Sequence, residues 1–345
     1  MTRLRGMDEL GEAASLVADF YTLTLPSKYH AVHHHGGINQ MFNGATVRDG
    51  QMQLRRLWAQ FRARAAKEEI FYYGLRVAEP HHDGTPHWHM VLYSRESDRE
   101  RLRAMLRELW LSEDGFEPGA ARHRIRILAC DRTVGSPAGY LAKYIAKNID
   151  GFEVGADFES GARARQDAGD YGAPEVPALE IDQMDALDTS KRVLTWAWLH
   201  GIRQFQFFGT ARVGLWRELR SLTDPCESPY IEAARRAADS GEWRAFIDAV
   251  GGVFAGPNTT ITLWRAELIN EDTGEIKLNQ FDEPAGRQTV GIIAPDGYLW
   301  TRLVTWRLER AVTVIDTSPR EERSGAGNPF GWTNPQETSM YGPLN

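Results

Sequence analysis

The chain has 345 residues, of which 42% are hydrophobic and 25% are charged. These proportions are ordinary for a globular protein and exclude disorder over the whole length, and the length predicts two domains or one domain with a large appendage. The formal net charge of −7 excludes a protein that coats DNA by neutralising its phosphates. Two cysteines exclude a disulfide framework and a thiolate zinc site of the usual kind. No secretory signal or membrane span is recognisable, so a cytoplasmic protein is expected.

The charge is distributed unevenly along the chain. Residues 48–147 carry 18 basic and 13 acidic groups. Residues 191–220 carry six basic groups and one acidic group, so each block has a net charge of +5. Residues 150–190 carry two basic and 11 acidic groups, a net charge of −9. Two basic blocks therefore flank an acidic insert, and a local basic surface is compatible with the acidic total.

The first half of the chain predicts alternating strands and helices. Alternation and β-branched or aromatic residues predict four strands, over 20–25, 70–77, 87–93 and 123–129. Apolar residues at helical spacing predict three helices, one after Asp49, one over 99–111 and one over 136–149. The expected N-caps are Asp49, then Ser97 or Asp98, and finally Ser136 ahead of Pro137.

The second half is divided by the acidic segment 150–190, which is predicted to be a linker or a surface excursion. A helix is expected from Ser190, followed by a strand at IRQFQFFG and two helices over 211–220 and 228–250. Strands are expected after residue 258, and the last 25 residues resemble a frayed tail. The order of elements predicts an α+β fold, with a central antiparallel or mixed sheet, helices on its faces, and a smaller C-terminal region of helices followed by strands.

The predicted hairpin at EPHHDGTPHWH carries a candidate metal site. His87 and His89 alternate on one strand, so their imidazoles point to the same face, with Trp88 opposite. Glu79 ends the partner strand and can complete a set of two histidines and one carboxylate, which leaves coordination positions open for a substrate. His81, also near the hairpin end, is the rival third ligand. The alternative is a structural role for histidines that happen to lie near a turn.

The segment GYLAKYIAKN carries candidate nucleophiles. Tyr140 and Tyr144 lie four residues apart and share one helix face, and each is followed three residues later by Lys143 or Lys147. A tyrosine can be a covalent nucleophile when an electrophilic acceptor and a nearby ammonium group activate it. The alternative is an amphipathic helix with core tyrosines and solvated lysines.

These segments, in this order, resemble the HUH endonucleases, named for two histidines that flank a hydrophobic residue, here His87-Trp88-His89. The match is closest to the bacteriophage replication gene A protein family. It rests on FYTLTLPS, YYGLRVAEPHHDGTPHWHMVLY, GYLAKYIAKNIDG and GIRQFQFFGTARVGLWRELR, and it covers about residues 20–220. The position of the metal motif before the tyrosines is similar to replication initiators, whereas relaxases reverse that order.

The resemblance implies a rolling-circle replication initiator that nicks and joins single-stranded DNA at an origin through a 5′-phosphotyrosine intermediate. His87, His89 and Glu79 would hold Mg²⁺ or Mn²⁺, and Tyr140 and Tyr144 would be the nucleophiles. Lys143 and Lys147 would stabilise charge on the phosphate or the leaving group. Thr22 and Thr24, on the first strand, would support the metal site. The candidate DNA contacts, which also read as ordinary surface and core residues, are Arg203, Phe205, Arg212 and Arg217.

The resemblance also suggests a division of the chain. The expected parts are an N-terminal extension (1–19), an endonuclease domain (20–220) with the acidic insert 150–190, an accessory α+β region (221–325) and a tail (326–345). A host helicase is a further partner that the family allows. Two other classes of function remain open: a metal-dependent hydrolase that uses the His/His/Glu set without a tyrosine, and a non-catalytic DNA-binding module on the same scaffold.

Overall fold

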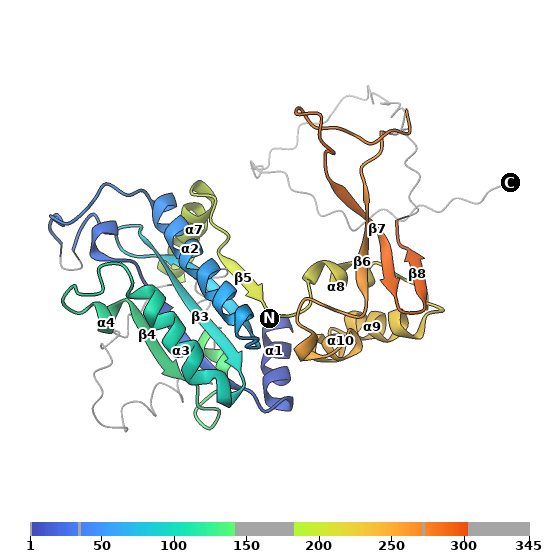
Figure 1. The fold of residues 1–345 in the computed structure, drawn as a ribbon, viewed down its shortest axis with the longest axis horizontal. Coiled ribbons are helices and arrows are strands. Elements are labelled where there is room, and N and C mark those ends of the chain that lie inside the picture. Colours follow the sequence, from blue (N-terminus) through green and yellow to red (C-terminus); the bar gives the residue numbers. More distant parts are fainter. Residues whose placement is uncertain (1, 34–35, 142–182, 271–272, 303–345) are drawn as a thin grey trace, which may run out of the picture. The chain divides into compact units, whose positions relative to one another are not determined.

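The structure, a computed structural model, describes residues 2–33, 36–141, 183–270 and 273–302. Its centre is a five-stranded antiparallel sheet with the strand order β4-β1-β3-β2-β5 (Figure 1). The strands are β1 (Val17–Leu23), β2 (Tyr72–Pro80), β3 (Pro86–Ser94), β4 (Ile125–Ala129) and β5 (Phe205–Phe208). The predicted α+β class with a central antiparallel sheet is confirmed.

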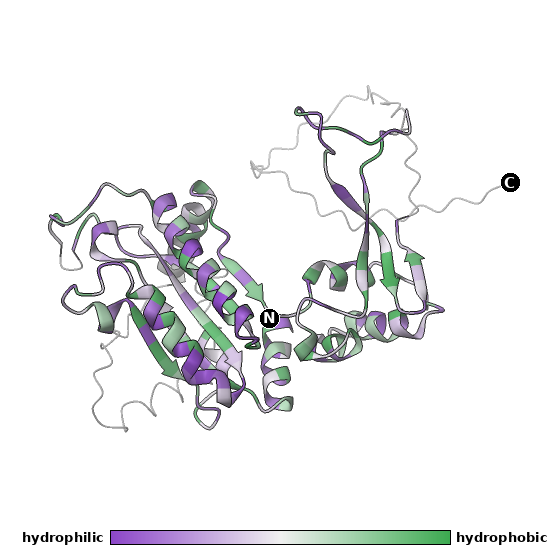
Figure 2. Cartoon of the chain, viewed as in Figure 1, coloured by the Kyte–Doolittle hydropathy of each residue, from purple (hydrophilic) through white to green (hydrophobic). Residues whose placement is uncertain are grey.

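One face of this sheet packs against three helices, α2 (Val47–Lys67), α3 (Glu96–Trp110) and α7 (Gln183–Leu199). Trp88 and Met90 of β3 are fully buried on this face. The strands are mainly hydrophobic, whereas the outer surfaces of α2 and α3 are largely hydrophilic (Figure 2). Burial of apolar side chains on both sides of the sheet is the main favourable contribution to folding.

The opposite face packs against α1 (Thr2–Ala13) and the helical residues 137–141. Helices α8 (Val213–Leu219), α9 (Pro229–Asp239) and α10 (Trp243–Ala249) follow β5 and belong to the same hydrophobic cluster, in which α10 packs against α1. Phe20 of β1 and Val77 of β2 belong to this core. Two short segments complete the part that surrounds the first sheet, η1 (Ser27–Tyr29) and α4 (Ala120–His123).

A smaller antiparallel sheet follows the last helices, with the order β6-β7-β8. Its strands are β6 (Thr262–Glu267), β7 (Arg287–Ala294) and β8 (Gly297–Trp300), after the short η2 (Val253–Ala255). Ile292 and Ala294 are buried in the same core as α8 to α10. The predicted change from helices to strands after residue 258 is therefore confirmed for the described residues.

The β2–β3 hairpin has a fixed register in which Glu79 lies opposite His87 and Val77 lies opposite His89. Its turn is closed by backbone hydrogen bonds from the His81 N–H to the Thr85 carbonyl (2.8 Å) and from the Gly84 N–H to the His81 carbonyl (2.9 Å). Gly84 has a φ of +83°, which glycine adopts without a steric penalty. The turn thereby aligns the ends of both strands.

Several predicted boundaries are wrong. Helix α2 begins one turn earlier than expected, because Thr46 is its N-cap and Asp49 is the third residue of a capping box. Arg95 is the N-cap of α3, so Ser97 and Asp98 lie inside its first turn. Ser136 does cap the next helix, since its Oγ accepts a hydrogen bond from the Gly139 N–H (3.0 Å).

Two helices differ from the prediction in other ways. Helix α1 was not predicted at all, and α7 begins at Gln183, inside the segment expected to be an acidic insert. The rest of that insert lies outside the described residues. None of the described helices combines the length and apolar character needed to cross a bilayer. The division of the chain at residue 220 stays a prediction.

Candidate metal centre

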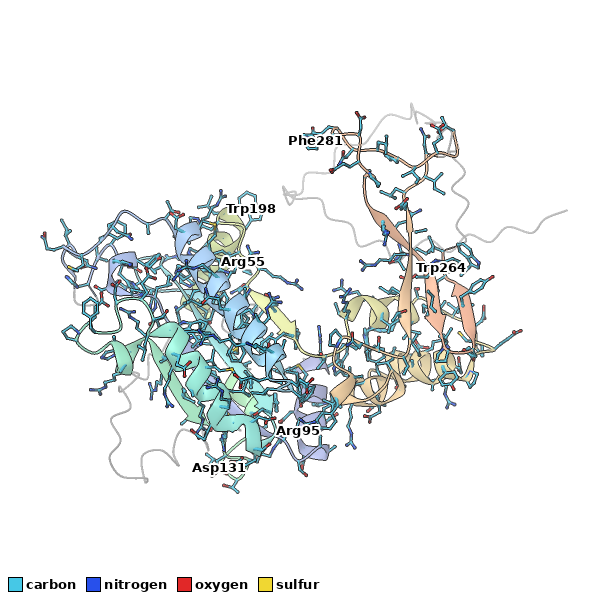
Figure 3. The ribbon with its side chains drawn as sticks, viewed as in Figure 1. Arg55, Arg95, Asp131, Trp198, Trp264 and Phe281 are labelled. Carbon is cyan, nitrogen blue, oxygen red and sulfur yellow. The ribbon has the colours of Figure 1, made fainter. Side chains whose placement is uncertain are left out.

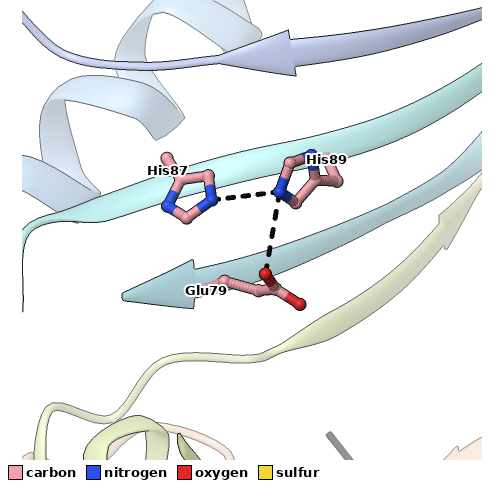
Figure 4. Close-up of side chains that lie close together, drawn as sticks. All are labelled: Glu79, His87 and His89. Atoms are coloured by element: carbon pink, nitrogen blue, oxygen red, sulfur yellow. Dashed lines mark hydrogen bonds and ion pairs between the residues drawn. The ribbon is translucent and has the colours of Figure 1, made fainter. Parts of the chain in front are cut away.

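Glu79, His87 and His89 converge at the end of the β2–β3 hairpin (Figure 4). The Nε2 atoms of His87 and His89 are 3.0 Å apart, and the Glu79 Oε2 atom lies 3.6 Å from the His89 Nε2 atom. Only 7% of Glu79, 9% of His87 and 7% of His89 is exposed. Strand alternation and the register of the hairpin bring these side chains to one face, as the sequence predicted.

The three donor atoms fit a divalent metal ion. They lie within 4.8 Å of one another, and a separation of about 3.0 Å is that of neighbouring ligands around an octahedral ion with bonds of about 2.1 Å. Two imidazoles and one carboxylate leave coordination positions open for a substrate. Mg²⁺, Mn²⁺ and Zn²⁺ are all compatible with this donor set, so the identity of the metal is not determined by it.

Thr22 orients one of the histidines from the neighbouring strand. It lies opposite His89 in the β1–β3 register, and its Oγ1 atom is 3.2 Å from the His89 Nδ1 atom. A hydrogen bond at Nδ1 fixes the ring so that Nε2 points toward the donor set. Thr24 has a different partner, since its hydroxyl donates to the His123 carbonyl (3.0 Å).

His81, the rival third ligand, packs beside the donor set. Its ring centroid is 4.1 Å from that of His87 and 5.1 Å from that of His30. The His30 Nδ1 atom is in turn 3.1 Å from the Asp83 Oδ2 atom. Burial tends to raise the pKa of Asp83, but the hydrogen bond from the Thr85 N–H and the charge of His30 outweigh burial and lower it. Glu79, and not His81, belongs to the group of described residues whose donor atoms lie within 4.8 Å of one another, and His81 packs against the ring of His87.

Phe20 connects the histidines to the tyrosine helix. Its ring stacks on His89, with centroids 5.7 Å apart and an interplanar angle of 18°, and it contacts the ring of Tyr140 at 6.0 Å. Tyr140 is half-buried on the helical residues 137–141. Phe20 thus contacts both His89 and Tyr140, whereas Lys143, Tyr144 and Lys147 lie outside the described residues.

The four candidate DNA-contact residues lie in different settings. All three arginines are exposed: Arg203 lies just before β5, Arg212 just before α8 and Arg217 within α8. Phe205 is half-buried and packs against the core on the face of Phe20. Among the described residues, no hydrogen bond or ion pair joins any of the four to Glu79, His87 or His89.

Sequence reasoning assigned no role to Phe20 or Arg126, although both belong to the surroundings of the centre. Phe20 lies two residues before Thr22, so strand alternation places both on one face. Arg126 is exposed and lies opposite Thr22 in the β1–β4 register. Strand alternation in the sequence is enough to place Phe20 beside Thr22. The position of Arg126 follows only from the pairing of β4 with β1, which the sequence does not show.

The chain is similar to replication proteins of bacteriophages. The model of the bacteriophage replication gene A protein (GPA) family matches residues 1–152. The chain is 40% identical over 352 residues to the replication gene A protein of Escherichia phage 186, which covers 96% of this chain and 46% of that protein. It is also 33% identical over 351 residues to the replication gene A protein of Escherichia phage P2, and this alignment covers 95% of this chain and 42% of the phage P2 protein.

The chain is similar to the bacteriophage replication gene A protein family, whose model matches its first 152 residues, and to gene A proteins over most of its own length. Another relative, from Salmonella paratyphi A, is 31% identical over 352 residues, covering 96% of this chain and 40% of the relative, and is named a probable replication endonuclease from a prophage-like region. The chain spans less than half the length of these three curated relatives. No solved structure matches it. The family resemblance seen in the sequence is confirmed, and the matched segment 1–152 contains the whole donor set.

Proposed function

We propose that this chain is an HUH-type endonuclease and strand transferase that nicks single-stranded DNA at a replication origin and rejoins it. The observation that carries the proposal is the gathering of Glu79, His87 and His89 on one sheet face, with Phe20 in contact with both His89 and Tyr140. A relative from Salmonella paratyphi A supports the same assignment, because it is named a probable replication endonuclease.

The chemistry is a transfer between two phosphate esters. The tyrosine oxygen forms a bond to the scissile phosphorus while the bond to the 3′ oxygen breaks, which leaves a 5′-phosphotyrosine and a 3′-hydroxyl. The proton lost by the tyrosine balances the proton gained by the 3′ oxygen. Because one phosphodiester replaces another, the joining step needs no external energy source, and the second tyrosine can carry it out.

The side chains of the proposed site have separate roles. Glu79, His87 and His89 hold the metal, which supplies Lewis-acid polarisation of the phosphate when it is bound. Thr22 keeps the His89 ring in its orientation. Lys143 and Lys147 stabilise the negative charge that develops on the phosphate and on the leaving oxygen. Phe20 packs between the ligand set and Tyr140 and excludes water from that side.

The proposal is tested by a covalent adduct. The chain is incubated with a pool of single-stranded oligonucleotides from the surrounding phage or prophage DNA, with Mn²⁺ or with EDTA, and analysed by denaturing gel electrophoresis. We expect an adduct that resists SDS, requires the metal and disappears in His87→Ala. A hydrolytic metalloenzyme would cleave the pool without any adduct, and a non-catalytic module would bind it without cleavage, so either result would overturn the proposal.

A further inference from the structure

Helix α2 presents a row of arginines on its solvent face. Arg48, Arg55 and Arg62 are exposed and follow one another at intervals of seven residues. Seven residues are close to two helical turns, so the three side chains line one face at steps of about 10.5 Å. Within the described part of the chain, none of the three forms an ion pair with a carboxylate.

A fourth arginine lies under this row. Arg76 of β2 is only 3% exposed. Its Nε and Nη2 atoms donate to the Gln206 Oε1 atom (3.1 and 2.6 Å), and its guanidinium lies 3.9 Å from the ring centre of Trp88. Its Nη1 atom has no hydrogen-bond partner, and no carboxylate among the described residues pairs with Arg76.

The charges nearest to Arg76 are of the same sign. Burial, and to a smaller extent the positive charges of Arg55 and Arg203, lower the pKa of Arg76 to about 9. A buried charge without a counter-ion is costly, and neighbouring like charges add to the cost. An anion at the surface between Arg55 and Arg203 would offset this repulsion, so the cluster has the electrostatics of a phosphate-binding surface.

An exposed aromatic side chain borders the arginine row. Trp198, at the end of α7, is 82% exposed, and Figure 3 labels it together with Arg55 of α2. The Arg48 Nη2 atom donates to the carbonyl of the next residue, Leu199 (3.2 Å), which joins the start of α2 to the end of α7. Arg203 follows five residues later and is exposed. Arginines beside an exposed aromatic ring are typical of surfaces that bind unpaired DNA strands.

We propose that Arg48, Arg55, Arg62, Arg203 and Trp198, here called the α2 surface, form a second binding surface for single-stranded DNA. The arginines contact the phosphates and Trp198 stacks on a base. The surface lies on the sheet face opposite to the metal centre, because Trp88, which is in contact with Arg76, alternates with His87 and His89 along β3. Both faces meet at the edge strand β5, so one strand can pass around this edge from one surface to the other.

This inference rests on the proposed function only in taking DNA as the partner, and equilibrium binding without metal tests it separately. Fluorescence anisotropy in EDTA measures the affinity of the full chain for a labelled single-stranded oligonucleotide across a series of salt concentrations. The test variant carries Arg48→Gln, Arg55→Gln and Arg62→Gln. The matched control carries Arg107→Gln, Arg122→Gln and Arg236→Gln, three exposed arginines that form no ion pair among the described residues.

The test variant should bind at least about ten-fold more weakly, and its slope of log affinity against log salt should fall by about 2, since each lost phosphate contact removes about 0.7. The control should keep the wild-type slope. Trp198→Ala should lose about ten-fold in affinity for the single strand without a change in slope. Equal losses in both triple variants would mean that only the total charge matters and would overturn the inference, as would wild-type binding by Trp198→Ala.

The same variants separate this inference from the proposed function. A test variant that binds weakly but still forms the covalent adduct at saturating DNA supports both proposals. Weak binding by the test variant, with no adduct formed by wild type under any metal condition, supports the α2 surface and overturns the nicking activity. If wild type forms the adduct but the test variant binds DNA as wild type does, the nicking activity is supported and the α2 surface is overturned.

Discussion

At the residue scale, the proposed metal centre depends on side chains that hold the ligands as well as on the ligands themselves. Thr22 contacts the far nitrogen of His89, whereas Thr24 on the same strand donates to a backbone carbonyl. The sequence predicted that both threonines would flank the centre. Strand β1 ends at Leu23 and the Thr24 N–H donates to the Arg124 carbonyl (2.9 Å), so only Thr22 keeps a contact with His89.

This difference gives a matched pair of variants. Thr22→Val keeps the size of the side chain but removes the hydroxyl that orients His89, so the affinity for Mn²⁺ should fall by roughly ten-fold or more. Thr24→Val should bind Mn²⁺ as wild type does. Isothermal titration calorimetry measures both, and equal affinities of the two variants would contradict the orienting role of Thr22.

The convergence of the three candidate ligands could be predicted from the sequence because it depends on local geometry alone. Alternation along one strand places His87 and His89 together, and a short hairpin brings Glu79 opposite His87. The neighbours of the ligands depend on which strands pair. The packing of His81 on His87 and the position of Arg126 beside Thr22 follow from tertiary structure, which no local pattern encodes.

At the element scale, β1 and α3 are joined by a buried charge cluster. Asp19 is 3% exposed and accepts hydrogen bonds from Arg99 (2.8 Å) and Arg103 (2.6 Å). Burial tends to raise the pKa of Asp19, but the hydrogen bonds from Arg103 and Arg99 outweigh it and lower the pKa. Because β1 also carries Phe20 and Thr22, this cluster helps to fix the strand that supports the metal centre.

The lowered pKa of Asp19 makes stability depend on pH. An aspartate whose pKa is lower in the folded state contributes stability above its unfolded pKa of about 3.9 and loses that contribution as the pH falls through the folded value. Asp19→Asn should lower the free energy of unfolding at pH 7 by about 3 kcal/mol, since it leaves two arginines without their partner. It should also show a smaller loss of stability than wild type between pH 5 and pH 3.

Urea unfolding at several pH values measures this effect. Glu100→Gln is the control, because Glu100 pairs with Arg103 at the surface, where its side chain is 75% exposed, and such pairs contribute less than about 1 kcal/mol. A stability of Asp19→Asn equal to that of Glu100→Gln at pH 7 would show that the buried cluster does not stabilise the fold.

Helix α1 shows why one element could not be predicted. Gly6 and Gly11 weaken its helical signal, since glycine costs about 1 kcal/mol relative to alanine in a helix. A Cβ atom at Gly6 would lie 2.5 Å from the Trp243 Cβ atom, and one at Gly11 would lie 2.8 Å from the Tyr93 ring. Both glycines therefore serve close packing against partners that are distant in the sequence.

At the scale of the whole molecule, the negative net charge does not indicate where DNA would bind, because the charge is unevenly distributed along the chain. The α2 segment carries six basic residues and one acidic residue, within a chain whose net charge is −7. The negative charge is concentrated in 150–190 and in the region after 220. A protein that acts on one site in single-stranded DNA needs local positive charge and no general affinity for duplex, so the overall charge and the proposed function agree.

The central claim is that a tyrosine of the segment GYLAKYIAKN becomes covalently linked to DNA, and peptide mapping of the adduct tests it most directly. Trypsin separates the two candidates, because cleavage after Arg132, Lys143 and Lys147 places Tyr140 and Tyr144 in different peptides. Mass spectrometry of the nuclease-trimmed adduct should find the nucleotide phosphate on one of these two peptides, and Tyr140→Phe combined with Tyr144→Phe should abolish it. A nucleotide attached to any other peptide, or an adduct that survives in the double variant, would contradict the account.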